Sequence, residues 1–392
     1  MAGRPSELMY VETPLLEQLK KLGWTVVQLD DSKKPDPQKS CRESFSEVVI
    51  VSRLKAALKR LNPWLNDVQI DDLCRQIQDY PHPLKQVLEN NEEVYDRITE
   101  GLSADNEETG EINCPVRLID WTDVDAYDGT DATDNDFLAI SQYKVRIPGK
   151  EEHIIPDIVL FVNGLPVVVI ECKAPDITEP MAEGIDQLMR YQNRRGAEEP
   201  EGVPELFYFN QIVMSTCFHD CRYSSITGGV SHFMEWKDAY PYKLRDINPN
   251  GKPSAQEIAV AGMLEPSHLL DIVQNFIAYK DEDSGIRVKL VPRYMQYRGA
   301  NKIIERLRNA AKGEKGGTLW HTQGTGKTLT MMFVIRKMYN SFDLNNYKVV
   351  LIVDRKDLQT QMFKTTKTVK YAINIAGSID GLNPSDIESL DV

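Results

Sequence analysis

An aspartate, a glutamate and a lysine interrupt an otherwise apolar stretch of the chain. Asp157 comes just before one apolar run, and Glu171 and Lys173 come at the end of the next. Side chains two residues apart on a strand project from the same face, and burying a glutamate or a lysine is costly unless it is paired or binds a metal. We therefore predict that Asp157 and Glu171 bind a divalent cation such as Mg²⁺, while Lys173 orients or deprotonates a water that attacks a phosphate.

The turn between the two apolar runs decides whether Asp157 and Glu171 lie on one face of the sheet. Asn163-Gly164 is a hairpin signal. A two-residue turn there places the two acids on opposite faces, whereas a three-residue loop with a bulge at Gly164 brings Asp157 opposite Glu171. We predict this offset, because Pro166 donates no hydrogen bond to the ladder and favours an irregularity. The alternative interpretation of the three residues is an ordinary ion pair at a strand end.

A glycine-rich loop lies between a short strand predicted at 316–320 and an apolar helix predicted at 329–338. Backbone N–H groups of such a loop converge on phosphates, a lysine adds charge and a hydroxyl binds Mg²⁺. His321 stands where this kind of loop usually has its first glycine, and a loop without a ligand is the alternative. The residues predicted to bind ATP are Thr322, Gly324, Thr325, Gly326, Lys327 and Thr328.

The apolar pattern predicts the elements that position these residues. Thr13 and Pro14 have the residue types of an N-cap and a first helical position, and leucines at helical spacing follow them up to Gly23. Further helices are predicted at 47–62 and 180–194. Strands are predicted at 207–216 and 348–354, the second as a buried parallel strand.

The hairpin, its Pro-Asp pair and the helix after it resemble the core of PD-(D/E)xK nucleases and, more narrowly, the restriction subunit of type I restriction-modification enzymes. That family has a Gln-x-x-x-Tyr motif after the nuclease lysine, which Gln187 and Tyr191 match on one helix face. Residues 12–16 and 207–211 are also similar to the family. Its first helix supplies a further acid near the metal, which the resemblance assigns to Glu12. The alternative is a glutamate that only stabilises the N-terminus of that helix.

The resemblance also implies a fold class and a division into domains. The expected class is α/β, with a nuclease-like mixed sheet flanked by helices and then a partial RecA-like domain that carries the phosphate loop. The expected boundaries are 1–240 for an endonuclease domain, 241–266 for a linker rich in proline, glycine and polar residues, and 267–392 for a helicase domain. Related helicases recognise adenine through a glutamine, which is Gln296 here.

The helicase motifs beyond the phosphate loop are incomplete. Residues 354–358 resemble motif Ia, in which Arg355 would contact a phosphate. Asp354 is alternatively a Walker B aspartate, although glutamate normally follows that residue and Arg355 follows here. No Asp-Glu-x-His or Asp-Glu-x-Asp follows an apolar strand. We interpret the chain as an N-terminal portion of the subunit that binds ATP, and we do not expect it to hydrolyse ATP alone.

Length and composition agree with two globular domains. The chain has 392 residues, 41% of them hydrophobic and 27% charged. Its apolar runs are too short for a membrane span and its six cysteines form no disulfide framework, so we expect a cytoplasmic protein. The net charge of −13 is uneven, because residues 89–136 hold 16 acidic and two basic side chains, whereas residues 287–337 hold 12 basic and two acidic ones. The basic region is a candidate polyanion-binding face, and the bland alternative is a solvated surface.

These observations favour the endonuclease and motor subunit of a type I restriction enzyme. The expected activity is Mg²⁺-dependent hydrolysis of phosphodiester bonds in double-stranded DNA, coupled in the full complex to ATP-dependent translocation. The resemblance implies methylation and specificity subunits as partners, since nothing in the chain resembles a base-reading module. Two other functions stay open: a nucleotide-binding assembly module in which the hairpin acids are structural, and a helicase with an inactive nuclease domain.

Overall fold

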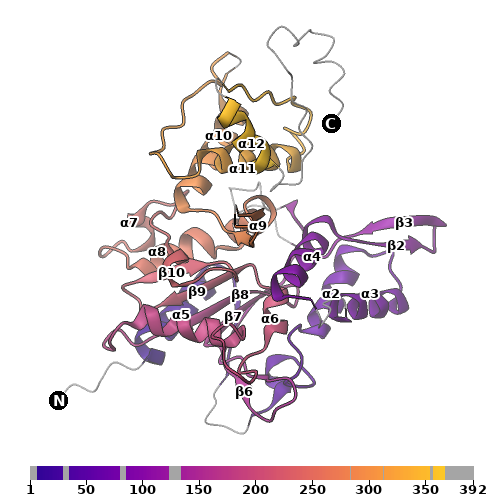
Figure 1. Cartoon of the computed structure of the whole chain (residues 1–392). Coiled ribbons are helices and arrows are strands. Elements are labelled where there is room, and N and C mark those ends of the chain that lie inside the picture. Colours follow the sequence, from indigo (N-terminus) through magenta and orange to yellow (C-terminus); the bar gives the residue numbers. More distant parts are fainter. Residues whose placement is uncertain are drawn as a thin grey trace. The chain divides into compact units, whose positions relative to one another are not determined.

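The chain forms two compact units in the computed structural model, which describes residues 7–29, 35–79, 85–122, 134–282, 284–311, 313–353 and 356–366 (Figure 1). The first unit comprises Met1–Ile277 and Val291–Tyr294, and the second comprises Ala278–Leu290 and Met295–Val392. Among the described residues, no helix is long and apolar enough to cross a membrane.

A seven-stranded mixed sheet is the centre of the first unit, in the order β1-β4-β7-β8-β9-β10-β11. The pairs β1-β4 and β8-β9 are parallel, and the other neighbours are antiparallel. The expected mixed sheet flanked by helices is confirmed. The strands are β1 (Thr25–Gln28), β4 (Phe137–Ser141), β7 (Ile158–Val162), β8 (Leu165–Cys172), β9 (Ile212–Thr216), β10 (Cys221–Ser224) and β11 (Met234–Glu235).

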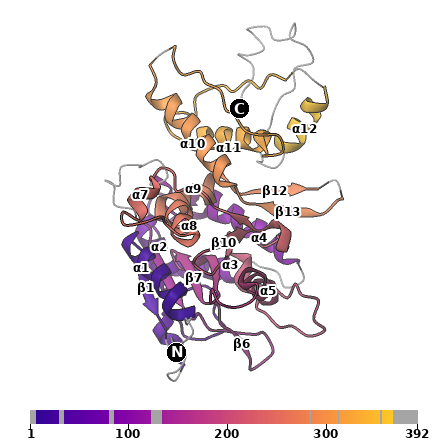
Figure 2. The same cartoon turned by 90° about the vertical axis from the view of Figure 1, so that its left-hand side faces the viewer.

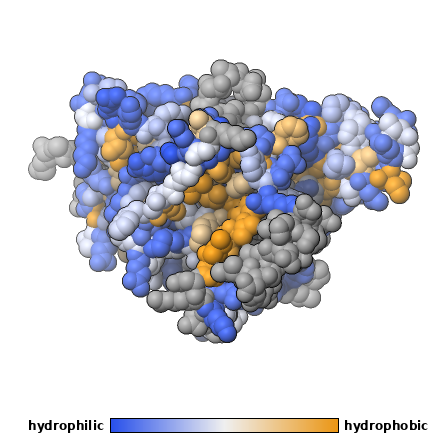
Figure 3. All heavy atoms as spheres, turned by 90° about the horizontal axis from the view of Figure 1, so that it is seen from above, coloured by the Kyte–Doolittle hydropathy of each residue, from blue (hydrophilic) through white to orange (hydrophobic). Residues whose placement is uncertain are grey.

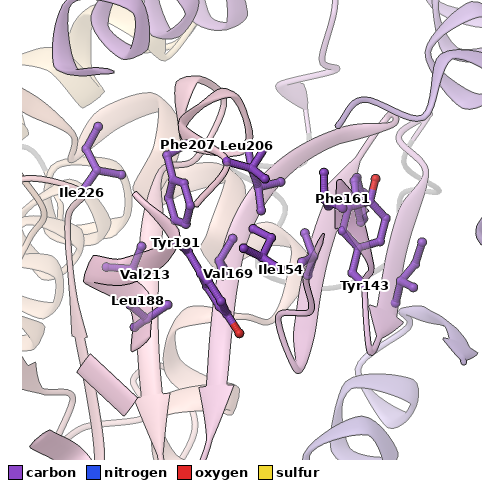
Figure 4. Close-up of a cluster of buried hydrophobic side chains, with 14 of the residues drawn as sticks. Tyr143, Ile154, Phe161, Val169, Leu188, Tyr191, Leu206, Phe207, Val213 and Ile226 are labelled. Carbon is purple, nitrogen blue, oxygen red and sulfur yellow. The ribbon is translucent and has the colours of Figure 1, made fainter. Parts of the chain in front are cut away.

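Helices cover both faces of this sheet. Figure 2 shows α1 (Thr13–Lys21) and α8 (Ala255–Met263) on one side and α5 (Pro180–Tyr191) on the other. Helices α1 and α5 are amphipathic and bury their apolar stripes, as α5 does with Ile185 and Leu188, whereas α8 is apolar and buried over most of its length. These residues join an apolar cluster that includes side chains from β7, β8 and β9 (Figure 4). Because β7 and β8 are buried along their whole lengths, the ends of these strands are held rigidly.

Smaller helices and strands surround the sheet. The acidic region 89–136 contributes some of these elements, and its residues 123–133 lie outside the described part of the chain. The remaining elements of the first unit are η1 (Leu8–Glu12), η2 (Pro37–Ser40), α2 (Val51–Leu61), α3 (Asp67–Asp79), α4 (Val87–Glu100), β2 (Leu102–Asn106), β3 (Glu111–Val116), β5 (Val145–Arg146), β6 (His153–Ile154), α6 (Pro204–Tyr208), η4 (Val230–His232), α7 (Leu244–Ile247) and α9 (Pro266–Asn275).

Two segments differ from the sequence-based expectations. The strand predicted at 207–216 begins only at Ile212, because helix α6 precedes it and the side-chain amide of Asn91 donates hydrogen bonds to the carbonyls of Phe207 and Tyr208. The segment 241–266, expected as a linker, contains α7 and the buried helix α8 and belongs to the first compact unit, which extends to Ile277.

The β7-β8 hairpin has the predicted offset but reaches it differently. Val162 pairs with Leu165, so the turn Asn163-Gly164 has two residues, and the register then shifts between Leu160 and Phe161. The extra residue is therefore Val167, next to Pro166, and there is no bulge at Gly164. Beyond the shift Ile158 pairs with Ile170, which puts the preceding Asp157 opposite Glu171.

Gly164 in this turn packs directly against the start of α2. Its φ is +83°, and a Cβ there would lie 2.5 Å from the carbonyl oxygen of Ile50. Gly149 has a similar φ of +77°, and a Cβ added to it would meet nothing within 4 Å, so this position isolates the cost of the backbone angle. We expect Gly149→Ala to lower the free energy of unfolding by about 1 kcal/mol and Gly164→Ala by about 3 kcal/mol or more. Urea unfolding measures both, and equal effects would contradict the close contact.

The second unit contains two antiparallel strands and three helices within its described residues. These are β12 (Ala278–Asp281), β13 (Arg287–Leu290), α10 (Tyr294–Asn309), α11 (Lys327–Asn340) and α12 (Lys356–Thr366). The strands predicted at 316–320 and 348–354 are wrong for the described residues 316–320 and 348–353, since no strand pairs with either segment there. Trp320 and Ile352 are consequently 88% and 81% exposed. On the face seen from above, Figure 3 shows hydrophobic atoms at the surface among mostly hydrophilic ones.

Candidate active site

Asp157, Glu171 and Lys173 lie together at one end of the β7-β8 hairpin. The Nζ atom of Lys173 is 3.2 Å from Oε2 of Glu171, and Oδ2 of Asp157 accepts a 2.8 Å hydrogen bond from the backbone N–H of Cys172. Their exposed fractions are 7% for Asp157, 0% for Glu171 and 5% for Lys173. An exposed ion pair at a strand end does not have this degree of burial, so the structure argues against that alternative.

Two buried carboxyl groups lie beside each other at this end of the sheet, so a nearby cation stabilises their ionised forms. Burial raises the pKa of Asp157, and burial together with the charge of Asp157 raises the pKa of Glu171 well above its ordinary value. Burial alone would lower the pKa of Lys173, but the charges of Glu171 and Asp157 outweigh it and the net shift is upward. Lys173 is therefore a cation in this arrangement, suited to donating hydrogen bonds rather than to removing a proton.

Carboxylate oxygens without a hydrogen-bond partner at this site suit a hard divalent cation. Oε1 of Glu171 and Oε1 of Glu12 are both buried without a hydrogen-bond partner. Within the described ranges, no group of three or more histidine, cysteine, aspartate or glutamate side chains is arranged to hold a metal ion by itself. Mg²⁺ usually keeps several waters and takes one or two carboxylates, so Asp157 and Glu171 match its ligand chemistry.

Glu12 is brought to the same place from the N-terminal end of the described chain. It is the last residue of η1, a π-helix that leads into α1, and π-helical turns occur often at functional sites. The side-chain amide of Gln142 donates to Oε2 of Glu12 at 3.0 Å and to Oδ1 of Asp157 at 3.3 Å. Burial, followed by the charge of Asp157, raises the pKa of Glu12 to about 7. The alternative of a simple helix-terminus glutamate does not account for this burial.

Two residues near the site carried no recognisable sequence signal. Gln142 follows β4 and was not predicted, because an isolated glutamine after a strand has no distinguishing pattern. Glu7 was also missed. Its pKa is raised by burial and by the charge of Asp157 and lowered by Lys173, so its carboxyl group lies within electrostatic reach of the site.

Gln187 and Tyr191 are brought together on α5, as their spacing predicts. Nε2 of Gln187 donates to the Tyr191 hydroxyl at 2.6 Å, and that hydroxyl donates to the carbonyl of Ile155 at 3.1 Å. Figure 4 shows the Tyr191 ring among apolar side chains with its oxygen at the edge of the cluster. Burial and the charge of Glu171 raise the pKa of Tyr191, which keeps its hydroxyl protonated beside that carboxylate.

Helix α5 approaches Lys173 closely because residue 184 has no side chain. A Cβ on Gly184 would lie 2.2 Å from Oγ of Ser215 and 3.4 Å from Cγ of Lys173. Ser215 pairs with Glu171 across the parallel β8-β9 ladder. The helix therefore packs onto the aliphatic part of Lys173 and restricts the positions that its ammonium group reaches.

The phosphate loop of the second unit has the backbone geometry that its glycines predict. Gly324 and Gly326 have φ angles of +81° and +78°, and α11 begins immediately afterwards at Lys327. Nζ of Lys327 donates to the carbonyls of His321 and Thr322 at 2.9 and 3.0 Å. Its charge therefore lies over the loop, at the N-terminus of a helix, where anions are favoured.

The other nucleotide-binding candidates surround this loop. The hydroxyl of Thr325 donates to the carbonyl of Thr322 at 2.7 Å, and Thr328 lies half-buried in the first turn of α11. The amide of Gln296 donates to the carbonyls of Thr325 and Gly326 at 3.3 and 3.2 Å. Gln296 thus contacts the loop, and its role in adenine recognition stays a prediction. Asp354 and Arg355 lie outside the described residues.

Comparisons with known proteins match both units. The family "Type I restriction enzyme R protein N terminus" matches residues 4–229, and the family "SWI2/SNF2 ATPase" matches residues 295–383. The HindI endonuclease subunit of a type I restriction enzyme from Haemophilus influenzae is 28% identical over 93% of this chain and 33% of its own length. The putative MjaVIIIP endonuclease subunit from Methanocaldococcus jannaschii is 27% identical over 92% of this chain and 32% of its own. The chain thus spans about a third of the length of these relatives.

Proposed function

Because the chain belongs to the family of type I restriction enzyme R protein N termini, we propose that its first unit is the Mg²⁺-dependent nuclease of such an enzyme. The substrate is double-stranded DNA, and the reaction is hydrolysis of phosphodiester bonds. The observation that carries this proposal is the buried group of Asp157, Glu171 and Lys173 on a bulged hairpin, in which Oε1 of Glu171 lacks a hydrogen-bond partner.

Each of these residues has a distinct task in the proposed reaction. Asp157 and Glu171 hold the cation, which when bound supplies Lewis-acid polarisation of the phosphate. The N–H of Cys172 fixes the Asp157 carboxylate, and Lys173 donates hydrogen bonds to a phosphate oxygen or to the attacking water. Gln187 fixes the Tyr191 hydroxyl, which donates to the carbonyl of Ile155 and so helps to place Asp157 two residues further along the chain. The rigid sheet keeps these groups in place without rearrangement during the reaction.

The second unit is proposed to bind ATP and to couple its hydrolysis to DNA translocation in the full complex. The match to the SWI2/SNF2 ATPase family and the geometry of the loop at 321–327 support nucleotide binding. Methylation and specificity subunits are the proposed partners, since the relatives are named subunits of type I restriction enzymes. All six cysteines are free thiols, which agrees with a cytoplasmic location for the complex.

Metal removal tests the nuclease proposal. A complex reassembled from this subunit and its partners is expected to cut plasmid DNA with Mg²⁺ and ATP, and to lose cleavage when EDTA removes the cation. Re-addition of Mg²⁺ should restore cleavage, and gel electrophoresis of the plasmid measures each step. Cleavage that continues in excess EDTA contradicts a role for Asp157 and Glu171 as metal ligands.

Nucleotide binding depends in this proposal on Lys327. Lys327→Ala is expected to weaken ATP binding by tenfold or more, because it removes the ammonium group that lies over the loop. Fluorescence titration measures the dissociation constant of a labelled ATP analogue bound to the 392-residue chain. Lys280→Ala, at an exposed lysine on β12, is the matched control and should leave binding unchanged. Equal affinity of the Lys327→Ala and unmodified chains contradicts the proposal.

A further inference from the structure

Gln142 makes three hydrogen bonds to the candidate active site. Its backbone N–H donates to the carbonyl of Asp157 at 2.7 Å. Its side-chain Nε2 donates to Oε2 of Glu12 at 3.0 Å and to Oδ1 of Asp157 at 3.3 Å. One residue therefore joins an acid from η1 to an acid at the start of β7, which are far apart in the sequence.

The backbone of Gln142 is strained, and these hydrogen bonds offset the strain. Its φ of +53° lies in the left-handed region, which is unfavourable for a residue with a side chain. Glycine would adopt this angle without cost, but it would leave both carboxylates without their shared donor. The strained position aims the amide between Glu12 and Asp157, and strain of this kind concentrates at functional sites.

A neutral donor with two N–H groups suits this position better than a cation does. Glu12 and Asp157 are both buried, and like charges in such surroundings repel each other. Lys173 already pairs with Glu171. An arginine or lysine in place of Gln142 would neutralise the carboxylates and compete with a metal ion, whereas an amide brings them together and leaves their charge available.

We propose that Gln142 is a positioning residue that holds the Glu12 carboxylate beside Asp157, so that Glu12 adds to the affinity of the site for a divalent cation. This inference rests on the proposed nuclease function. Oε1 of Glu12 is buried without a hydrogen-bond partner, so it is available to accept a hydrogen bond from a water bound to the cation. Gln142 acts only through Glu12 and Asp157 and does not touch the substrate.

A double-mutant cycle with Mn²⁺ as the probe tests this role. Electron paramagnetic resonance of free Mn²⁺ measures the dissociation constant of the complex between Mn²⁺ and the 392-residue chain, without DNA. Gln142→Leu, which keeps the side-chain volume but removes the donor, and Glu12→Gln are each expected to weaken binding about tenfold. The double variant should bind no more weakly than Gln142→Leu, because the contribution of Glu12 is already lost once the amide that positions it is removed. Multiplied effects in the double variant, or unchanged binding by Gln142→Leu, overturn the proposal.

Three further variants make the result unambiguous. Gln142→Gly relieves the backbone strain while removing the amide, so it should fold at least as well as Gln142→Leu and show the same weakened binding. Gln69→Leu is the matched control, because the Gln69 amide donates to the carbonyl of Asp105 in β2 and to no residue of the site, and it should bind Mn²⁺ normally. Asp157→Asn should abolish binding. Binding that survives Asp157→Asn contradicts the proposed metal site itself, whereas loss with Asp157→Asn but not with Gln142→Gly contradicts only the role of Gln142.

Discussion

Replacing Lys173 with alanine is expected to reduce DNA cleavage by the assembled complex by about 10²–10³-fold, while ATP-driven movement along DNA continues. The ammonium group lies 3.2 Å from Glu171, and its pKa is raised by the charges of both hairpin acids. Its loss removes the hydrogen-bond donor for the phosphate or the attacking water. In the proposal above the motor function belongs to the second unit, so movement along DNA should not depend on this side chain of the first unit.

Plasmid linearisation and triplex displacement measure the two activities on one preparation. Lys173→Met is the companion variant, because it keeps the aliphatic packing against Gly184 and removes only the charge. Lys150→Ala is the control, since Lys150 pairs with Glu199 at 2.8 Å and not with a residue of the site. Full cleavage by the Lys173→Met complex would show that the hairpin residues are structural, and loss of both activities would point to misfolding or failed assembly.

Mg²⁺ is expected to stabilise the chain strongly, and Asp157→Asn is expected to remove that effect. At a Mg²⁺ concentration of 100 times its dissociation constant, binding adds about 2.7 kcal/mol to the free energy of unfolding, which corresponds to a rise of about 5 °C in the melting temperature of a unit of this size. Without Mg²⁺, Asp157→Asn should melt higher than the unmodified chain at pH 8, because it removes one of two neighbouring buried negative charges.

The pH dependence follows from the direction of the pKa shifts. The pKa of Glu12 is raised in the folded chain from 4.5 to about 7, and those of Asp157 and Glu171 are also raised. A raised pKa means that the folded chain holds the proton more tightly than the unfolded chain. The stability that Glu12 contributes is therefore fully present below about pH 4.5 and is lost as the pH rises through about 7. Mg²⁺ replaces those protons. Its stabilising effect should therefore be larger at pH 8 than at pH 6.

Differential scanning fluorimetry at both pH values, with and without Mg²⁺, measures this effect. Asp67→Asn serves as the control. Asp67 lies on α3, where its exposed carboxylate pairs with Lys59, and it is not part of the site. Its response to Mg²⁺ should equal that of the unmodified chain. A Mg²⁺ effect that is the same at pH 6 and pH 8, or that persists in Asp157→Asn, contradicts cation binding between the two hairpin acids.

The hairpin that positions the nuclease residues was largely predictable from the sequence. The spacing of Glu171 and Lys173 places them on one face, and Pro166 indicated an irregular ladder. The sequence did not reveal whether the extra residue lies in the turn or in β8, because Pro166 is compatible with a longer turn and with a bulge in the strand. The structure selects the bulge at Val167, and Asp157 comes opposite Glu171 in either case.

The role of the segment after the nuclease fold was less predictable, although one signal was present. Its proline and glycine content indicated a linker, but Ser254 and Glu257 form a capping box that starts α8. Gln256 on this helix donates to the carbonyl of Val11 at 3.1 Å and accepts from the hydroxyl of Thr216 at 2.9 Å. Helix α8 thus holds the π-helix that carries Glu12, a long-range contact that composition does not indicate.

Gln142 and the apolar segment at 348–353 show the two limits of sequence reasoning here. Gln142 matters because of a left-handed backbone angle and contacts with two distant segments, neither of which has a local pattern. The segment at 348–353 has the composition of a buried strand, but a strand also needs neighbours, and in the described chain it pairs with none.

The most direct test of the nuclease site is a crystal structure of the chain grown with Mn²⁺, examined by anomalous scattering. A single strong peak is expected between a carboxylate oxygen of Asp157 and Oε1 of Glu171, with Lys173 still paired to Glu171. A map with no peak there, in crystals whose Mn²⁺ is bound elsewhere on the first unit, would contradict the assignment of these residues as the cation-binding centre.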